Sequence, residues 1–360
     1  MSLEAELAAE IAVFRQDGAA PPFEPWALRI FRHQYDRNPP YRTFCDRRGV
    51  TPETVVRWED VPPVPTAAFR GADLACGAAE IVFRTSGTTG GGAARGRHLV
   101  PCAALYRASA LAAFETFVLP DGLHPRVLAL LPGPAVRPDS SLVHMCGWVG
   151  EASGAATEWL ADADGLDIDR VCTRLADAER TGEAVLLAGP TAAFARLFET
   201  CRTTGRRFRL GPPSRLMDTG GAKGMARPLS RGAFFRECYT HLGLASYHCI
   251  NEYGMTELCS QRYDSVLWDR FQGRSLAPRR LVAPPWLRTR VLDPDTLAPV
   301  PAGTDGLLCH HDLANAGSVA VVLTEDIGHT VGDDGIAVLG RTAGAPPRGC
   351  GLLLAELAGA

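Results

Sequence analysis

The sequence predicts an α/β fold with mostly parallel sheets and flanking helices. The main observation is a set of apolar runs, each followed by a glycine-containing segment: Arg126–Leu131, Ala184–Ala188 and Arg215–Asp218. Runs of this length without polar alternation are typical of strands buried on both faces. The composition agrees with this interpretation, because 46% hydrophobic residues over 360 positions supply a large core.

The order of elements supports this class. Apolar residues recur at helical spacing near the N-terminus, from Leu3 to Phe14, and Ser2 is a plausible N-cap. A proline-rich stretch near residue 62 ends this region. Further helices are predicted over Thr191–Thr203 and Pro228–Leu242, after the second and third strands. We therefore expect a helical flank over residues 1–78, an α/β core over 79–341 and a short tail over 342–360.

The charge and cysteine patterns exclude several classes of protein. The 37 basic and 40 acidic residues give a net charge of −3, which argues against a nucleic-acid partner. No apolar run is long enough to span a membrane, and the acidic N-terminus does not resemble a secretory signal. The 11 cysteines contain no CxxC pair, as is typical of reduced thiols. We expect a cytoplasmic protein with no membrane partner.

The strongest local motif lies at residues 83–92, Phe-Arg-Thr-Ser-Gly-Thr-Thr-Gly-Gly-Gly. Its glycines let the backbone approach an anion closely, and its hydroxyl groups and free N–H groups can then surround that anion. The spacing is not that of a Walker P-loop. The motif predicts a phosphate-binding loop, although a solvent-exposed loop has the same composition.

Two further segments carry groups that suit a nucleotide. Residues 251–257, Asn-Glu-Tyr-Gly-Met-Thr-Glu, offer a ring for stacking on a base, a hydroxyl for a phosphate and a carboxylate for Mg²⁺. Residues 323–328, Leu-Thr-Glu-Asp-Ile-Gly, are expected to form a loop whose Asp326 can bind a ribose, with Arg341 available to neutralise a phosphate or carboxylate. Taken alone, each segment also fits an ordinary turn.

In this order, the three segments resemble the adenylate-forming superfamily of acyl-CoA synthetases, firefly luciferases and peptide-synthetase adenylation domains. Within it, the pattern is most similar to the acyl-protein synthetase (LuxE-type) family, whose members supply acyl groups to a fatty-acid reductase. The segments that carry this resemblance are residues 61–70, 83–90, 139–142, 217–224 and 348–351.

The resemblance implies the large N-terminal domain of that superfamily, with ATP and Mg²⁺ as cofactors and a carboxylic acid as substrate. The acid would react at the α-phosphate of ATP to give an acyl-adenylate and pyrophosphate. Tyr253 would stack on adenine, Thr256 would contact the α-phosphate, Glu257 would hold Mg²⁺ and Asp326 would bind the ribose beside Arg341. The implied ATP- and AMP-binding set is Thr85, Ser86, Gly87, Thr88, Thr89, Gly90, Gly220, Gly221, Tyr253, Gly254, Thr256, Asp326 and Arg341.

The length and the lysine content set this chain apart from most of the superfamily. Most members carry a C-terminal domain of roughly a hundred residues with a catalytic lysine. Here 19 residues follow Arg341 and none is a lysine, so we expect that domain to be absent. The one lysine of the chain is Lys223, in a glycine-flanked loop at a predicted strand end. Lys223 is therefore a catalytic candidate for the missing positive charge, with Arg95, Arg97 and Arg341 as alternatives.

Cys350 lies between two glycines and follows Arg348. In the family that the chain resembles, a cysteine at this place accepts the acyl group as a thioester. We expect the adjacent arginine to lower the pKa of the thiol and the glycines to let the tail swing. The alternative is a buried cysteine in a terminal helix over Leu352–Leu357.

Other assignments stay open. His144, together with Ala222, is a candidate for the acyl pocket, although a lone histidine often has a purely structural role. The pair His310-His311 is not predicted to bind a metal, because neighbouring side chains on a strand point to opposite faces. The acyl group would pass to Cys350 and then to an acyl-acceptor protein, either a reductase or a carrier protein. Coenzyme A, a carrier-protein thiol or an amine could instead accept the acyl group directly, and a non-catalytic nucleotide-binding scaffold is a further alternative.

Overall fold

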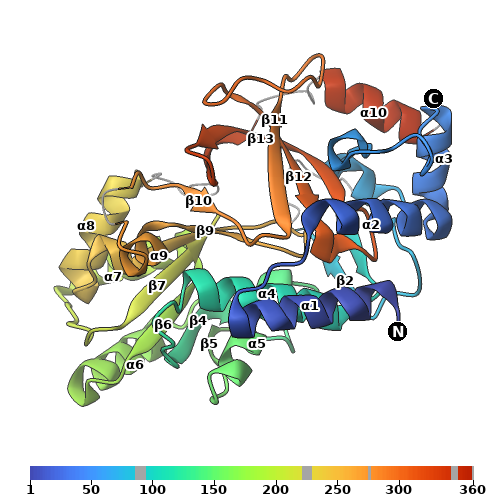
Figure 1. Ribbon diagram of the computed structural model, residues 1–360. Coiled ribbons are helices and arrows are strands. Elements are labelled where there is room, and N and C mark those ends of the chain that lie inside the picture. Colours follow the sequence, from blue (N-terminus) through green and yellow to red (C-terminus); the bar gives the residue numbers. More distant parts are fainter. Residues whose placement is uncertain (86–94, 221–228, 275–276, 342–347, 359–360) are drawn as a thin grey trace. The chain divides into compact units, whose positions relative to one another are not determined.

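The structure is a computed structural model that describes residues 1–85, 95–220, 229–274, 277–341 and 348–358 (Figure 1). The chain divides into two units. The antiparallel-sheet unit comprises Met1–Ala113, Met255–Gln261 and Val282–Ala360, and the parallel-sheet unit comprises Phe114–Gly254 and Arg262–Leu281. Helix α4 (Ala103–Phe117) and the short strand β10 (Leu281–Val282) each include a point of division.

The parallel-sheet unit is the alternating strand–helix region that the sequence predicts. Its strands lie in the order β9-β8-β7-β6-β4-β5, and all neighbours except β8 and β9 are parallel. The strands are β4 (Arg126–Pro132), β5 (Glu158–Ala161), β6 (Val185–Pro190), β7 (Arg215–Thr219), β8 (Cys249–Tyr253) and β9 (Arg262–Asp264). The predicted strands at 126, 184 and 215 are therefore confirmed as β4, β6 and β7.

Helices occupy the connections between these strands (green to yellow in Figure 1). They are α5 (Ser141–Ala152), α6 (Ile168–Thr181), α7 (Thr191–Thr204) and α8 (Arg231–Leu242), with the 3-10 turn η3 (Ser246–His248) and α9 (Val266–Phe271) further on. Phe194 and Phe198 of α7 and Phe234 of α8 lie in one buried cluster with Leu187 of β6 and Leu216 of β7. This packing confirms the two predicted helices, and burial of their apolar faces stabilises them.

The sheet of the other unit is antiparallel, so the expectation of mostly parallel strands is wrong for this part of the chain. Its order is β11 (Leu287–Leu292), β12 (Gly306–Asp312), β13 (Val321–Val331) and β14 (Gly335–Arg341). The two-residue strand β1 (Val64–Pro65) runs parallel to β13. Short connections without a helix join neighbouring strands of opposite direction, which explains the difference.

Most of the remaining elements of this unit come from the two ends of the chain. They are α1 (Leu3–Asp17), α2 (Phe23–Arg37), α3 (Pro39–Arg47), the 3-10 turns η1 (Trp58–Asp60), η2 (Thr66–Arg70) and η4 (Leu313–Asn315), the hairpin β2 (Ile81–Arg84) and β3 (Arg97–Val100), and α10 (Arg348–Ala358). Ser2 caps α1 as predicted, because its side chain accepts a hydrogen bond from the Ala5 N–H at 3.2 Å. Helix α10 packs against α3 and β1. No helix in the described ranges is long and apolar enough to cross a membrane.

Candidate functional site

The predicted phosphate-binding loop connects the two strands of the β2–β3 hairpin. Thr85 extends this hairpin, because its N–H donates to the Gly96 carbonyl at 3.0 Å and its hydroxyl accepts from the Gly96 N–H at 2.9 Å. Ser86, Gly87, Thr88, Thr89 and Gly90 lie outside the described residues. Their role in binding phosphates therefore stays a prediction.

Three predicted site residues gather in the antiparallel-sheet unit. Asp326 on β13 is paired in register with Arg341 on β14, and Nε of Arg341 donates to Oδ1 of Asp326 at 2.8 Å. The Asp326 side chain is 9% exposed, whereas that of Arg341 is 38% exposed, so the arginine is the member of the pair that solvent or a ligand can reach. Both charges act on Glu257, which places its carboxyl beside them.

Glu257 is a buried carboxyl that is poised to change charge near neutral pH. Burial raises its pKa to about 7, and the Asp326 carboxylate adds to this effect. A hydrogen bond from its own backbone and the positive charges of Arg341 and Arg70 act in the opposite direction. A cation bound beside this carboxyl would favour its charged form, because the cation supplies the stabilisation that water no longer gives.

The position of Asp326 corrects the sequence-based expectation of a loop. Residues 323–328 lie inside β13. Leu323, Ile327 and Gly328 pair with β12, and Asp326, Ile327 and Gly328 pair with β14. Gly328 marks a shift in register rather than a turn. A Cβ atom at Gly328 would lie 2.2 Å from the Ala337 carbonyl oxygen, so the glycine is needed for close approach of β14.

The side chains that support residues 256–260 were not predicted from the sequence. His98 places one ring nitrogen 2.7 Å from the Thr256 carbonyl oxygen and the other 2.9 Å from Oδ1 of Asn315. Nδ2 of Asn315 donates to the Glu257 carbonyl at 2.9 Å. Burial lowers the pKa of His98 to about 4. These contacts hold the backbone of Thr256 and Glu257. No local sequence motif predicts these contacts.

Asp312 completes this support. Its carboxylate accepts from the Cys259 N–H at 2.8 Å and from the Ser260 hydroxyl at 2.6 Å. The neighbouring His310 and His311 contact Thr289 and Arg290, respectively. Among the residues in the described ranges, no group of three or more His, Cys, Asp or Glu could hold a metal ion.

Cys350 lies in α10 and is buried, with 4% of its surface exposed. Its Sγ atom contacts the carbonyl oxygen of Thr324 at 3.9 Å, two residues before Asp326. Burial raises the pKa of the thiol to about 11, and the charge of Glu325 adds to this. The expectation of a lowered pKa is therefore wrong for this conformation, because desolvation of the thiolate dominates. Its role as acyl acceptor stays a prediction.

The parallel-sheet unit carries the other predicted nucleotide residues. Tyr253 is the last residue of β8, and Gly254 follows it. Gly220 directly follows β7 and has a φ of +82°, a backbone conformation that favours glycine. Gly221, Ala222 and Lys223 lie outside the described residues.

A polar cluster at the carboxyl ends of β6, β7 and β8 was not predicted. We call it the strand-end cluster, and it comprises Thr191, Asp218, Thr219, Arg231, Asn251 and Glu252. Thr219 donates a hydrogen bond to the Glu252 carboxyl. Burial raises the pKa of Glu252 to about 7, against the effect of this hydrogen bond, and the nearby Asp218 raises it further.

His144 lies in α5, half-buried. Its Nε2 atom is 3.0 Å from the Pro138 carbonyl oxygen, and its ring meets that of Trp148 edge-on at 5.6 Å. These contacts account for its orientation. Its predicted place in the acyl pocket remains a prediction.

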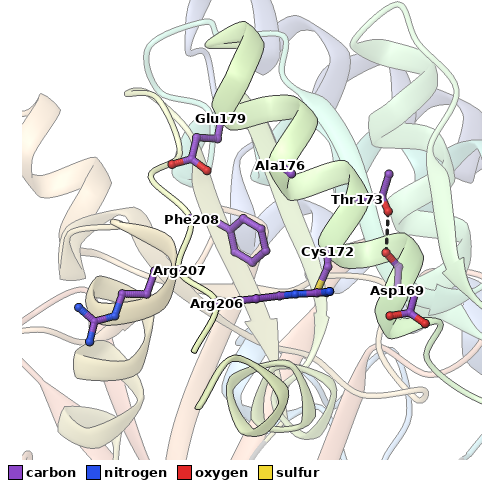
Figure 2. A pocket seen from close by; sticks show the side chains of 8 residues that line it. All are labelled: Asp169, Cys172, Thr173, Ala176, Glu179, Arg206, Arg207 and Phe208. Atoms are coloured by element: carbon purple, nitrogen blue, oxygen red, sulfur yellow. Dashed lines mark hydrogen bonds between the residues drawn. The ribbon is translucent and has the colours of Figure 1, made fainter. Parts of the chain in front are cut away.

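A cavity of about 390 Å³ opens beside α6 and the segment 206–208 (Figure 2). Figure 2 shows the Arg206 side chain beside Cys172, and Arg207 directed away from it. The cavity is lined by Asp169, Cys172, Thr173, Ala176, Glu179, Arg206, Arg207 and Phe208. None of the predicted site residues lines this cavity.

Comparison with known proteins places this sequence in a family. The family profile described as acyl-protein synthetase, LuxE, matches residues 7–358. The long-chain-fatty-acid–luciferin-component ligase of Aliivibrio fischeri is 23% identical over 308 residues, covering 83% of this chain and 76% of that protein. The ligase of the same name from Vibrio harveyi is 22% identical over 342 residues, covering 91% and 85%, respectively.

Solved structures show the same fold at low sequence identity. An open conformation of 2-hydroxyisobutyryl-CoA ligase, in complex with 2-HIB-AMP and CoA, has a TM-score of 0.66 at 16% identity and covers 88% of this chain and 68% of that chain. ATP-bound MatB from Rhodopseudomonas palustris has a TM-score of 0.51 at 18% identity, with coverages of 74% and 49%. The likeness shows the α/β fold of the large domain of adenylate-forming CoA ligases. Because the family profile spans nearly the whole chain, this chain belongs to the LuxE family of acyl-protein synthetases.

Proposed function

We propose that this protein activates a carboxylic acid with ATP to an acyl-adenylate and then transfers the acyl group to the thiol of Cys350, from which a partner protein takes it. The observation that carries this proposal is the grouping of Glu257, Asp326 and Arg341, with Cys350 in contact with the same strand. Family membership supports it, and relatives at 22–23% identity are ligases of long-chain fatty acids.

In the first step, a carboxylate oxygen of the acid forms a bond to the α-phosphorus of ATP and pyrophosphate leaves. Asp326 would accept hydrogen bonds from the ribose hydroxyls, with its orientation set by Nε of Arg341. The remaining N–H groups of the Arg341 guanidinium would offset the negative charge of the phosphates. The phosphates would be held by Thr85–Gly90 and Thr256. The adenine side of the nucleotide site would be formed by Tyr253, Gly254, Gly220 and Gly221.

The residues present suit a magnesium ion carried by ATP. Such an ion takes one or two carboxylates and completes its coordination with phosphate oxygens and water. The single buried carboxyl of Glu257, with a pKa of about 7, matches that requirement. When bound, the ion would neutralise charge on the phosphates, and Glu257 would hold it in place.

In the second step, Sγ of Cys350 forms a bond to the acyl carbon, the bond from that carbon to the phosphate oxygen breaks, and AMP leaves. The thiol first has to lose its proton to water or a solvent base. Because the thiol is buried with a pKa of about 11, this step requires that α10 leave its present position.

A second candidate function is favoured by the same burial of Cys350. In this alternative, coenzyme A, a carrier-protein thiol or an amine accepts the acyl group directly, and Cys350 is structural.

The experiment is a pyrophosphate-release assay over fatty, aryl and amino acids, combined with mass analysis of the peptide that contains Cys350. We expect pyrophosphate release with at least one acid and an acyl increment on Cys350. A Cys350→Ala variant should still release pyrophosphate in the first turnover but carry no protein-bound acyl group. Normal transfer by this variant would assign the acceptor role to an external thiol or amine. No pyrophosphate with any acid would indicate a nucleotide-binding scaffold.

A further inference from the structure

Thr256 and Glu257 form a turn in the segment between β8 and β9, outside any strand or helix. A backbone hydrogen bond from the Leu258 N–H to the Met255 carbonyl, at 3.2 Å, closes this turn. Its other carbonyls need partners from elsewhere, because no sheet or helix supplies them. The Thr256 hydroxyl and the Glu257 carboxyl are proposed to bind the α-phosphate and Mg²⁺. Their positions therefore depend on the groups that hold the turn.

His98 contacts this turn from a distant part of the sequence. It lies on β3, paired in register with Phe83 of β2, in the hairpin that carries the predicted phosphate-binding loop. Its Nδ1 atom is 2.7 Å from the Thr256 carbonyl oxygen. The residue is buried, and its ring meets that of Phe69 edge-on at 5.7 Å, which limits rotation of the ring. His98 therefore connects two segments that are proposed to bind the same nucleotide.

The protonation of His98 decides which of its contacts is a hydrogen bond. Burial lowers the pKa of His98 to about 4, so the ring is neutral at pH 7 and has one N–H group. Both ring nitrogens face oxygen atoms, the Thr256 carbonyl at 2.7 Å and Oδ1 of Asn315 at 2.9 Å. The Asn315 oxygen also accepts from the Cys259 thiol at 3.6 Å, whereas the Thr256 carbonyl has no second donor among the residues that the structure describes. The shorter contact and the need of this carbonyl place the proton on Nδ1.

Asn315 holds the next carbonyl of the turn. Its Nδ2 atom donates to the Glu257 carbonyl at 2.9 Å and to the Val319 carbonyl at 2.8 Å. Asn315 is itself held by Gln34 of α2, whose Nε2 atom donates to the Asn315 carbonyl at 3.0 Å. Two consecutive carbonyls are thus fixed by buried side chains. This support matters for a reaction, because misplacing a reacting group by about 1 Å can cost roughly 10²-fold in rate.

We propose that His98 is a positioning residue for adenylation: its Nδ1–H group holds the Thr256 carbonyl, and the turn then keeps the Thr256 hydroxyl and the Glu257 carboxyl in place for the α-phosphate and Mg²⁺ of ATP. In this role His98 acts through the turn and contacts neither the nucleotide nor the acid. Loss of the N–H group lets the turn move, so the rate falls although every group that contacts ATP is still present. This inference rests on the proposed adenylation.

The first variant is His98→Phe, which removes the N–H group and keeps a ring against Phe69. Pyrophosphate release is measured with the acid that reacts fastest among fatty, aryl and amino acids. We expect kcat to fall about 10- to 100-fold, as for the loss of other supporting hydrogen bonds around a site. The Kd for ATP in the presence of Mg²⁺, measured by calorimetry without acid, should rise about tenfold. The KM for the acid should change less than about threefold, because the acid is not proposed to contact the turn.

Two conservative variants test the assignment of the proton. The amide nitrogen of His98→Asn can take the place of Nδ1, whereas that of His98→Gln can take the place of Nε2. We therefore expect His98→Asn to recover kcat to within about tenfold of the parent, and His98→Gln to stay as slow as His98→Phe. Both variants keep a polar amide at the buried position, so their comparison decides the question even where His98→Phe does not fold.

The matched control is His310→Phe, the same substitution at another buried histidine of the same unit. His310 lies on β12, and its Nδ1 atom is 2.7 Å from the Thr289 hydroxyl. Urea unfolding should show that both His→Phe variants are less stable than the parent, because each loses a buried hydrogen bond. His310→Phe should nevertheless keep the kcat and the Kd for ATP of the parent.

The outcomes separate this inference from the function on which it rests. A loss of kcat in His98→Phe that His98→Asn reverses, and that His310→Phe does not share, supports the positioning role. The inference alone is overturned if His98→Phe keeps the kcat of an active parent, if His310→Phe loses as much, or if His98→Asn is no more active than His98→Gln. Absence of pyrophosphate release by the parent with every acid overturns the proposed function and this inference with it.

Discussion

Arg341 and Asp326 form an ion pair across neighbouring strands, with Nε of the arginine donating to Oδ1 of the aspartate at 2.8 Å. The pair lies beside Glu257, whose carboxyl has a pKa of about 7. In the proposed function, a ribose bound at Asp326 would meet a carboxylate already oriented by the Arg341 guanidinium.

Replacement of Asp326 should disable nucleotide binding without unfolding the protein. We expect Asp326→Ala to lower kcat/KM for ATP by about 10²-fold or more, because two hydrogen bonds to a charged group contribute roughly 1.5–3 kcal/mol each. The freed guanidinium of Arg341 is 38% exposed and can be hydrated. The matched control is Asp305→Ala, since Asp305 also pairs with a β13 residue, His329, three residues further along the strand. Equal loss in both variants would exclude a ribose contact.

The pKa of Glu257 predicts a pH-dependent requirement for Mg²⁺. Below pH 7 the carboxyl holds a proton that the ion must displace. We therefore expect the Mg²⁺ concentration for half-maximal adenylation to rise up to about tenfold for each pH unit below 7. Titrations with Mg²⁺ between pH 5.5 and 8 measure this, and Glu257→Gln should abolish adenylation at every pH. A half-maximal concentration that does not change with pH would remove Glu257 as the ligand.

Burial of two carboxyls also predicts how stability changes with pH. The pKa values of Glu252 and Glu257 rise from about 4.5 to about 7 on folding. The native state then binds more protons than the unfolded state between these values, so the free energy of unfolding decreases as pH rises through this window. The effect is on the order of 3 kcal/mol for each carboxyl. Urea unfolding without Mg²⁺ should show it, and each Glu→Gln variant should have a smaller pH dependence than the parent.

Lys223 is predicted to supply the positive charge of the adenylation step. It lies outside the described residues, so this prediction rests on its place after Gly220 and Gly221. We expect Lys223→Ala to lower the adenylation rate by roughly 10²-fold or more, as for the loss of a preorganised charge. Lys223→Arg, which keeps the charge, should recover part of the rate. An unchanged rate in Lys223→Ala would leave Arg95, Arg97 or Arg341 to supply the charge.

Helix α10 has to move before Cys350 can react. Glu356 of this helix contacts Arg48 through its carboxylate, and its carbonyl accepts from Nη1 of Arg47 at 2.7 Å. An exposed ion pair contributes at most about 1 kcal/mol, so Glu356→Gln should increase alkylation of Cys350 by iodoacetamide up to about fivefold. The half-buried Cys102 serves as a reference within the same protein. Glu199→Gln, which breaks an exposed pair within α7, is the control.

In the parent protein, Cys350 should react more slowly than Cys102, because its thiol is more deeply buried. Alkylation of Cys350 at the rate of Cys102 would show that α10 spends most of its time away from its present position. Alkylation that Glu356→Gln and Glu199→Gln raise equally would show that the Arg48 contact does not hold the helix.

The sequence by itself determined what local periodicity and chain chemistry control. The runs that became β4, β6 and β7 contain no polar alternation, and α7 and α8 carry apolar residues at helical spacing, so both kinds of element are encoded within a dozen residues. The side chains proposed for the nucleotide, such as Glu257 and Asp326, could be named because they stand in recurrent motifs. The capping of α1 by Ser2 is equally local.

Only the tertiary structure decided how those side chains are held. The contact of His98 with Thr256 joins residues 158 positions apart, and that of Asn315 with Glu257 joins residues 58 apart, so neither leaves a local signal. Asp326 lies in a strand rather than a loop because β14 pairs with it at Arg341, and β12 pairs with Leu323 and Ile327 before and after it. Burial likewise depends on distant segments: α10 packs on α3, and this burial raises the pKa of Cys350 that its neighbours in the sequence were expected to lower. Hydrogen bonding and desolvation are set by which atoms meet in space, and the order of residues along the chain does not specify them.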